Sequence, residues 1–253
     1  MPEYKNALVT GAAKRLGRAI ALDLASSGWS VAVHCHQATD EADQLVREIR
    51  KNGARAMVLA GDLADPQTPG RLIEEAIAAL GPLTCLVNNA SIFESDEIET
   101  MTDESWESHL KINLKAPAFL AQAFAAQLPQ GAAGNIINMI DQRVWKPTPR
   151  FFSYAVSKSG LWAMTQTMAQ ALAPHIRVNA IGPGPAMVNA RQSQADFDRQ
   201  AAATILGHGT TPEEICRTVR YILSAPAMTG QMIALDGGQH LAWQTPDIVG
   251  ITE

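Results

Sequence analysis

The sequence has 253 residues, of which 47% are hydrophobic and 18% are charged, values typical of a soluble globular protein with a sizeable core. The formal net charge of −5 disfavours nucleic acid or an anionic membrane as the main partner. No apolar run approaches the roughly 20 residues of a transmembrane helix, and residues 1–6 lack a signal-peptide core. We therefore expect a cytoplasmic protein with a small-molecule partner.

The cysteines and histidines give no sign of a metal site. Cys35, Cys85 and Cys216 are far apart in the sequence and match neither a disulfide framework nor a metal-ligand spacing. The six histidines form no clustered ligand motif. The sequence thus predicts reduced thiols and no bound metal.

Short apolar runs alternate with helical patterns along the chain. The expected strands are residues 7–9, 31–33, 56–59, 83–87, 136–140, 176–179 and 232–235. The expected helices are residues 18–26, 41–51, 71–80, 103–127 and 154–171. Such alternation is typical of parallel strands joined by right-handed crossovers. The predicted fold is α/β, a single doubly wound domain over residues 1–253 with a seven-stranded parallel sheet.

The first strand runs into a turn of small residues, TGAAKRLGRAI, at residues 10–20. Gly11 permits a tight turn, and Gly17 allows the following helix to lie close to the sheet. Free N–H groups at the start of that helix suit a pyrophosphate. We interpret this segment as a dinucleotide-binding loop.

The end of the second strand indicates which dinucleotide binds. NAD sites usually carry an acidic residue here for the ribose 2′-hydroxyl, but residues 33–38 read VHCHQA, with no carboxylate before Asp40. Lys14 and Arg15 lie in the neighbouring loop. Two cations and no acid favour a 2′-phosphate, hence NADP(H). The alternative is that these cations are solvated loop charges and that Asp40 caps the next helix.

Tyr154 and Lys158 have a spacing that suits proton transfer. At positions i and i+4 they share one face of the predicted helix. A nearby ammonium favours the tyrosinate, so we expect a lowered pKa for Tyr154 and a role as acid at neutral pH. The alternative is an ordinary surface pair on a helix.

Several motifs together resemble the short-chain dehydrogenase/reductase family, over residues 6–238. These are the glycine loop, Asp62-Leu63, Asn88-Asn89-Ala90, Asn113, Tyr154 with Lys158, Pro183-Gly184 and Asp236-Gly237-Gly238. The resemblance implies a Rossmann domain, a homotetramer and an NADP(H)-dependent oxidoreductase. It implies that Asn113 holds a water linked to Lys158 and that Lys158 bonds the nicotinamide ribose. The implied cofactor contacts are Gly11, Lys14, Arg15, Leu16, Gly17, His36, Gln37, Asp62, Leu63, Asn89, Ala90, Tyr154, Lys158, Pro183 and Gly184.

Four departures from the usual family pattern are similar to the pteridine reductases and dihydromonapterin reductases. They are Arg15, Ser91, Phe93 and Asp141. That resemblance implies that Arg15 touches both cofactor phosphate and substrate, that Phe93 and the nicotinamide sandwich a pterin ring, and that Asp141 assists Tyr154. The implied substrate residues are thus Arg15, Ser91, Phe93, Asp141 and Tyr154.

Two features differ from that subfamily or extend beyond the family pattern. Gln37 stands where a basic residue would help to hold the 2′-phosphate. Residues 239–253 form a C-terminal extension, which could cover a site or pack on a neighbouring subunit. Residues 187–206 match the family's mobile substrate loop but carry no motif for a particular substrate.

The function expected from these residues is NADPH-dependent reduction of a dihydropterin to its tetrahydro form. The substrate is expected to be of the dihydromonapterin or dihydrobiopterin type, or dihydrofolate. A carboxyl group at Asp141 can supply a proton to a ring C=N or accept an N–H bond, which the family's usual serine does less well. One alternative is a carbonyl or 3-oxoacyl-thioester reductase. Another is a catalytically silent NADP(H)-binding sensor, which predicts loss of Asn113, Tyr154 or Lys158.

Overall fold

A seven-stranded, all-parallel sheet forms the centre of the computed structural model, which describes residues 4–189 and 191–251. Its strands lie in the order β3-β2-β1-β4-β5-β6-β7. They are β1 (Asn6–Val9), β2 (Ser30–Cys35), β3 (Ala56–Ala60), β4 (Cys85–Asn88), β5 (Gly134–Met139), β6 (Ile176–Pro183) and β7 (Met232–Leu235). The predicted α/β Rossmann fold with seven parallel strands is confirmed.

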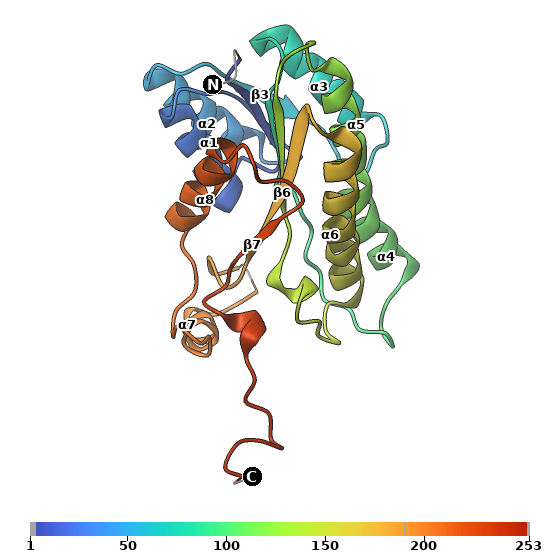
Figure 1. Cartoon of the computed structure of the whole chain (residues 1–253), viewed down its shortest axis with the longest axis vertical. Coiled ribbons are helices and arrows are strands. Elements are labelled where there is room, and N and C mark those ends of the chain that lie inside the picture. The colour runs from blue at the N-terminus through green and yellow to red at the C-terminus, as the bar shows by residue number, and fades with distance from the viewer. Residues whose placement is uncertain (1–3, 190, 252–253) are drawn as a thin grey trace.

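Helices cover both faces of this sheet. One layer contains α1 (Arg15–Ser26), α2 (Thr39–Lys51) and α8 (Pro212–Ser224), and the other contains α3 (Thr68–Leu80), α5 (Ala116–Gln127) and α6 (Phe152–Leu172) (Figure 1). Helix α2 shows why a helix packs on the sheet. Its buried residues Ala42, Leu45, Val46 and Ile49 recur at helical spacing and so form one apolar face. The strands between the two layers are apolar and mostly buried on both faces.

The helices differ from the sequence predictions in three ways. Helices α1 and α3 begin three residues before their predicted starts, and α2 and α6 begin two residues before theirs. The predicted helix over residues 103–127 consists of α4 (Asp103–Leu110), a π-helical turn at Lys111–Lys115, and α5. Helices α7 (Gln194–Ala202) and α8 were not predicted. The capping box of Thr211 and Glu214 at the start of α8 is a signal that the sequence analysis missed.

The strand order fixes where a ligand can bind. Strand β1 pairs with β2 on one side and with β4 on the other, so the crossover connections diverge between β1 and β4. A crevice at the carboxyl ends of strands forms at such a point. The segments that follow β1, β4, β5 and β6 carry the predicted site residues, and the topology brings them to this edge.

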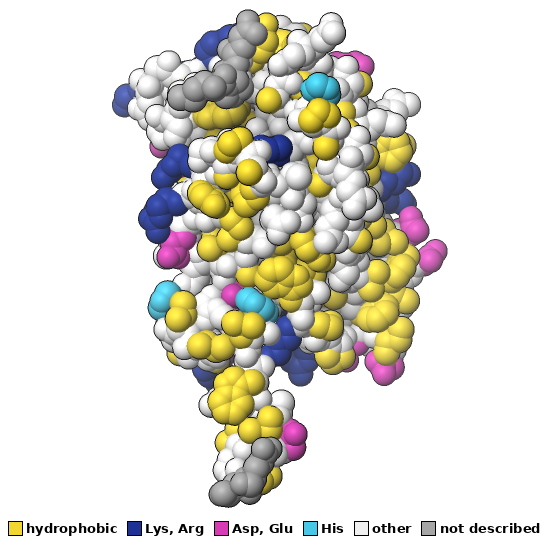
Figure 2. Space-filling view, viewed as in Figure 1, with side chains coloured by type: hydrophobic (Ala, Val, Ile, Leu, Met, Phe, Trp, Pro, Cys, Tyr) yellow, Lys and Arg dark blue, Asp and Glu magenta, His cyan; other side chains and the backbone are white. Residues whose placement is uncertain are grey.

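The C-terminal segment leaves the body of the molecule after a 3₁₀ turn at Gln239–Leu241. Lys146 holds its base by donating from Nζ to the carbonyl of Ala242, at 2.8 Å. Residues 242–251 then extend away from the sheet, as Figure 1 shows. Figure 2 shows hydrophobic side chains along this extension. The large exposed ones are Trp243, Ile248, Val249 and Ile251, and Leu241 in the preceding turn is exposed as well.

Candidate functional site

Two glycines beside the loop after β1 leave no room for a Cβ atom. Gly11 has a φ of +60°, and a Cβ there would lie 2.9 Å from the Cα of Ala90. A Cβ on Gly17 would lie 2.5 Å from the side-chain nitrogen of Asn89. Lys14 at the N-cap of α1 makes no side-chain cap hydrogen bond. The first N–H groups of α1 are therefore not capped by the side chain of Lys14, and free N–H groups at a helix start suit a phosphate.

A buried histidine that the sequence analysis missed supports this loop. His34 accepts a hydrogen bond at Nδ1 from the N–H of Gly11, and its Nε2 lies 3.1 Å from the carbonyl of Gly61. These contacts fit a neutral ring that carries its proton on Nε2. Burial lowers the pKa of His34 to about 4, so the ring stays neutral at pH 7.

The predicted 2′-phosphate region contains an acid that the sequence analysis did not place there. The Nζ atom of Lys14 lies 2.6 Å from Oε1 of Glu41, and both side chains are exposed. The expectation of two cations without a nearby acid is therefore wrong for Lys14. Asp40 lies in the first turn of α2 and does not cap it, since the N-cap is Ala38. Across the same surface, Nε2 of His36 lies 4.0 Å from Oδ2 of Asp62.

A cavity of about 510 Å³ opens beside this loop. It is formed mainly by the segments after β1, β4, β5 and β6, with α6 and α7. The predicted residues that line it are Arg15, Leu16, Asn89, Ser91, Phe93, Asp141, Tyr154, Lys158, Pro183 and Gly184. The predicted residues outside its wall are Gly11, Lys14, Gly17, His36, Gln37, Asp62, Leu63, Ala90 and Asn113.

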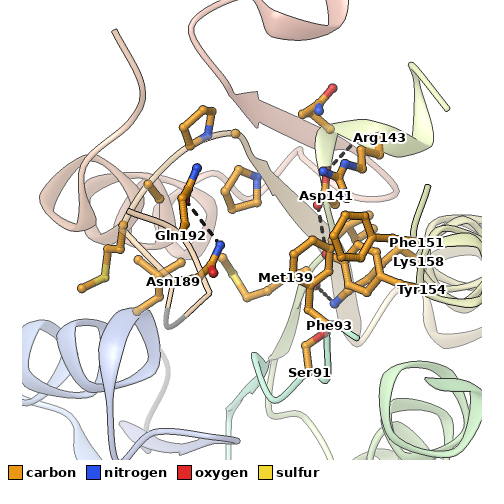
Figure 3. Close-up of a pocket in the computed structure, with 18 of the residues that line it drawn as sticks. Ser91, Phe93, Met139, Asp141, Arg143, Phe151, Tyr154, Lys158, Asn189 and Gln192 are labelled. Carbon is orange, nitrogen blue, oxygen red and sulfur yellow. Dashed lines mark hydrogen bonds between the residues drawn. The ribbon is translucent and has the colours of Figure 1, made fainter. Parts of the chain in front are cut away.

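Asp141 and Tyr154 form a hydrogen-bonded pair in this cavity (Figure 3). The hydroxyl of Tyr154 donates to Oδ2 of Asp141 at 2.9 Å. The other carboxyl oxygen, Oδ1, accepts the N–H of Arg143 at 2.8 Å. Because Asp141 also caps the 3₁₀ turn Gln142–Val144, its carboxyl group is held in one orientation toward the tyrosine.

The predicted lowering of the Tyr154 pKa is wrong in this structure. Burial raises that pKa well above 10, and the charge and hydrogen bond of Asp141 raise it further. The ammonium of Lys158, which was expected to lower the pKa of Tyr154, donates a hydrogen bond to the carbonyl of Met139 at 2.8 Å. Burial also lowers the pKa of Lys158 to about 8. Tyr154 is thus a protonated donor at neutral pH, and its hydroxyl bonds to the carboxyl group of Asp141.

Asn113 lies behind the cavity and is fully buried within the π-helical turn. Its side-chain amide donates to the carbonyl of Ile92 at 3.0 Å and to the hydroxyl of Ser157 at 3.1 Å. Its oxygen accepts from the N–H of Ile92 and from the hydroxyl of Ser91. These contacts hold the segment after β4 against α6. The role of Asn113 in holding a water stays a prediction.

One wall of the cavity is aromatic and cationic. Phe93 stacks on Phe151 with a centroid distance of 4.2 Å and contacts Tyr154 edge-on at 4.6 Å. The guanidinium of Arg143 lies 5.2 Å from the Phe93 ring centroid and 5.0 Å from that of Phe151. Its Nη1 is buried and has no hydrogen-bond partner among the described residues. Figure 3 shows these side chains grouped beside Asp141.

Arg15 links the dinucleotide loop to the segment after β6. It has a φ of +54° at the position of the family's middle glycine, in a region that favours glycine. Its guanidinium donates to the carbonyls of Val188, at 2.5 Å, and Met187, at 3.2 Å. A strained backbone held by such contacts is often functional. The guanidinium of Arg15 therefore lies where the dinucleotide loop meets the cavity.

Fifteen cavity residues were missed by the sequence analysis as individual site residues. They are Ser95, Met139, Ile140, Gln142, Arg143, Phe151, Pro185, Ala186, Met187, Asn189, Arg191, Gln192, Phe197, Gln200 and Gln239. Eight of the fifteen lie between β6 and α8, where Arg191 donates to the carboxylate of Glu94 and the carbonyl of Phe93. Glutamines and arginines in segments without a motif carry no signal that separates them from ordinary surface residues.

Residues 4–189 and 191–251 contain neither a metal-binding cluster nor a membrane-spanning helix. Within these ranges, no group of three or more histidine, cysteine, aspartate or glutamate side chains is placed to hold a metal ion. None of the helices found there has both the length and the hydropathy to cross a membrane.

Comparison with solved structures supports the fold. The chain is 46% identical to FolM alternative dihydrofolate reductase 1 from Brucella suis, solved with NADP. That match has a TM-score of 0.95 and covers 98% of this chain and 100% of the other. For the Brucella canis protein of that name, also with NADP, the identity is 46%, the TM-score 0.92 and the coverage 96% and 97%.

Sequence comparison gives the family. The chain is 31% identical to the 3-oxoacyl-[acyl-carrier-protein] reductase FabG of Staphylococcus epidermidis over 242 residues, which is 94% of this chain and 99% of the relative. The family profile described as short chain dehydrogenase matches residues 5–199. With the parallel sheet and the Tyr154–Lys158 pair in the cavity, these matches show that the chain is an oxidoreductase that belongs to the short-chain dehydrogenase family.

Proposed function

We propose that the protein uses NADPH to reduce a dihydropterin to its tetrahydro form. The observation that carries the proposal is the 2.9 Å hydrogen bond from the Tyr154 hydroxyl to Asp141 inside the cavity. The relatives that are 46% identical are named alternative dihydrofolate reductases. A dihydrofolate also contains the pterin ring, so this name is compatible with a substrate of the monapterin, biopterin or folate type.

NADP(H) is the cofactor that the residues of the dinucleotide end fit. Bound NADPH supplies the hydride that reduces the substrate C=N bond. The N–H groups at the start of α1 suit the diphosphate, and Lys14 can exchange its contact with Glu41 for the 2′-phosphate. The family resemblance implies that Lys158 bonds the nicotinamide ribose. Structures of the two Brucella relatives and of a 32% identical blue fluorescent protein contain NADP or NADPH.

Proton delivery falls to Asp141 and Tyr154. When hydride reaches the imine carbon, the imine nitrogen needs one proton, and the Tyr154 hydroxyl, which carries a proton at neutral pH, can donate it. Asp141 bonds that hydroxyl and can share or replace its proton. Phe93 offers a flat apolar surface to a bicyclic ring, and the unpaired Nη1 of Arg143 can donate to a ring oxygen.

A carbonyl or 3-oxoacyl-thioester reductase is the second candidate. It is favoured by the FabG relatives at 31% identity. Asp141 and Ser91 argue against it, because the resemblance implies a serine and a glycine at these positions in ordinary members. A silent NADP(H)-binding protein is the third, and the intact Asn113, Tyr154 and Lys158 argue against that reading.

A substrate panel tests the proposal. We would follow NADPH oxidation by the purified protein with dihydromonapterin, dihydrobiopterin, dihydrofolate and acetoacetyl thioester as separate substrates. We expect turnover of at least one dihydropterin and little turnover of the thioester. Turnover of the thioester alone would establish the carbonyl reductase, and turnover of none would favour the silent protein. We also expect a homotetramer, which light scattering would test.

A further inference from the structure

A buried polar cluster lies directly behind Tyr154 and takes no part in the chemistry described above. It consists of Asp96, His109 and Ser153, whose exposed fractions are 4%, 0% and 0%. The His109 ring packs edge-on against Tyr154, with a centroid distance of 6.2 Å. A nucleophilic role for the serine is ruled out by its burial and by its bonds, because its hydroxyl donates to the carboxylate of Asp96 and not to the histidine.

His109 joins the segment of the aromatic wall to two helices. Its Nε2 accepts the N–H of Glu94, the residue after Phe93, at 3.1 Å. A neutral ring must then carry its proton on Nδ1. That nitrogen lies 2.8 Å from the carbonyl of Ser105 in α4 and 2.8 Å from the hydroxyl of Ser153 in α6. One side chain therefore connects residues 93–94, α4 and α6.

Asp96 supplies the cap that helix α6 lacks. The N-cap of α6 is Phe151, which has a φ of +58° and makes no side-chain cap hydrogen bond. Asp96 accepts the N–H of Ser153 with its carboxylate and the N–H of Phe152 with its backbone carbonyl, each at 3.1 Å. A carboxylate at this end of a helix is favourable.

The charge of Asp96 is maintained inside the protein. Burial acts to raise its pKa, but hydrogen bonds from Ser153 and Ser105 outweigh that effect, and the pKa is lowered. The anion is thus solvated by the first residues of α6, immediately before the tyrosine. The residues that Asp96 caps and the Tyr154 hydroxyl therefore belong to the same turn, the first turn of α6.

We propose that Asp96 and His109 are positioning residues that fix the distance between the Tyr154 hydroxyl and the Phe93 wall. Phe93 lies one residue before Glu94, and Tyr154 lies one residue after Ser153, so the cluster ties both to one rigid unit. The inference rests on the proposed function in taking Tyr154 as the proton donor. A misplacement of about 1 Å in such a site can cost about a hundredfold in rate.

Kinetic comparison of two variants tests the positioning role. His109→Leu removes both ring contacts, whereas His109→Gln keeps an acceptor and a donor on a side chain of similar reach. We expect His109→Leu to lower kcat by about 10- to 100-fold with an unchanged Kd for NADPH, and His109→Gln to recover most of kcat. Assays run at least ten degrees below each measured Tm. A lowered Tm with wild-type kcat in His109→Leu would overturn the proposal.

If His109→Leu does not fold, Asp96→Asn serves as the test variant. It keeps the volume of Asp96 and removes its charge. We expect it to lower kcat for the dihydropterin without changing the Kd for NADPH. A wild-type kcat in this variant would also overturn the proposal.

Crystal structures with NADPH make the test independent of the substrate. In wild type and His109→Gln we expect the same contact between Tyr154 and Asp141. In His109→Leu, or in Asp96→Asn if that variant replaces it, we expect the Tyr154 hydroxyl or the Phe93 ring to shift by about 1 Å. Unchanged positions would overturn the inference even if no dihydropterin is reduced, whereas failure of all dihydropterins with a shifted tyrosine would contradict only the proposed substrate.

Discussion

The cofactor half and the substrate half of the crevice are formed by different parts of the protein chain. At the cofactor half, backbone atoms and small residues define the surface, because Gly11 and Gly17 leave no room for a Cβ. At the substrate half, side chains such as Asp141, Phe93 and Arg143 define it. The cofactor half therefore allows few substitutions but carries little information about the substrate. The substrate half carries the specificity.

The largest expected effect is at the substrate half, in Tyr154→Phe. This change removes the hydroxyl that donates to Asp141 and keeps the aromatic contact with Phe93. We expect kcat for the dihydropterin to fall by about 10²–10⁴-fold, the usual contribution of general acid catalysis. The Kd for NADPH, measured by fluorescence titration, should stay within about twofold of the wild-type value. A kcat near the wild-type value would show that the Tyr154 hydroxyl does not deliver the proton.

A smaller effect is expected at the cofactor half, from the buried His34. Because its pKa falls from 6.5 to about 4 on folding, the unfolded chain alone binds a proton as pH falls between these values. Stability is therefore full above pH 6.5 and decreases by about 3 kcal/mol as the pH falls through 4. His34→Asn keeps an acceptor for the N–H of Gly11 and cannot titrate.

Urea denaturation at pH 7 and pH 4.5 measures this contribution. The free energy of unfolding should fall more steeply with acid in wild type than in His34→Asn, by about 2–3 kcal/mol over that interval. Equal decreases in the two proteins would show that His34 does not carry the pH dependence.

The smallest effect concerns cofactor choice. Lys14→Ala should weaken NADPH binding by about tenfold, or about 1.4 kcal/mol, and leave NADH binding unchanged. Its matched variant is Glu41→Gln, which frees Lys14 from its 2.6 Å contact and should strengthen NADPH binding. Calorimetric Kd values for both cofactors separate these outcomes. Equal changes in the Kd values for NADPH and NADH would show that Lys14 does not contact the 2′-phosphate.

The fold could be predicted from the sequence because its signals are local and repeated. Each buried strand is a short apolar run, and each early turn has glycine where the chain must turn or approach another segment closely. The π-helical turn at Lys111–Lys115 was missed because such a turn has no distinct sequence pattern, and its buried residue is the polar Asn113. Helix α7 was missed because none of its described residues is buried, so it carries no apolar stripe.

The substrate half could be predicted only in part. Asp141 and Phe93 stand at positions that the family resemblance identifies, and both line the cavity. Phe151 and Arg143 lie in a connecting segment whose path depends on contacts with residues far away in the sequence. The pKa of Tyr154 was predicted in the wrong direction, because spacing shows the nearby Lys158 but not the burial or the carboxyl group beside the hydroxyl.

The account depends most on Asp141, and one measurement tests it directly. We would compare kcat for a dihydropterin and for acetoacetyl thioester in wild type, Asp141→Ser and Asp141→Asn, after checking that NADPH affinity is unchanged. The account predicts that both variants lose about 10²–10⁴-fold in dihydropterin turnover, since neither carries an ionisable group at the 2.9 Å contact with Tyr154. Dihydropterin turnover at the wild-type rate in both variants would contradict it.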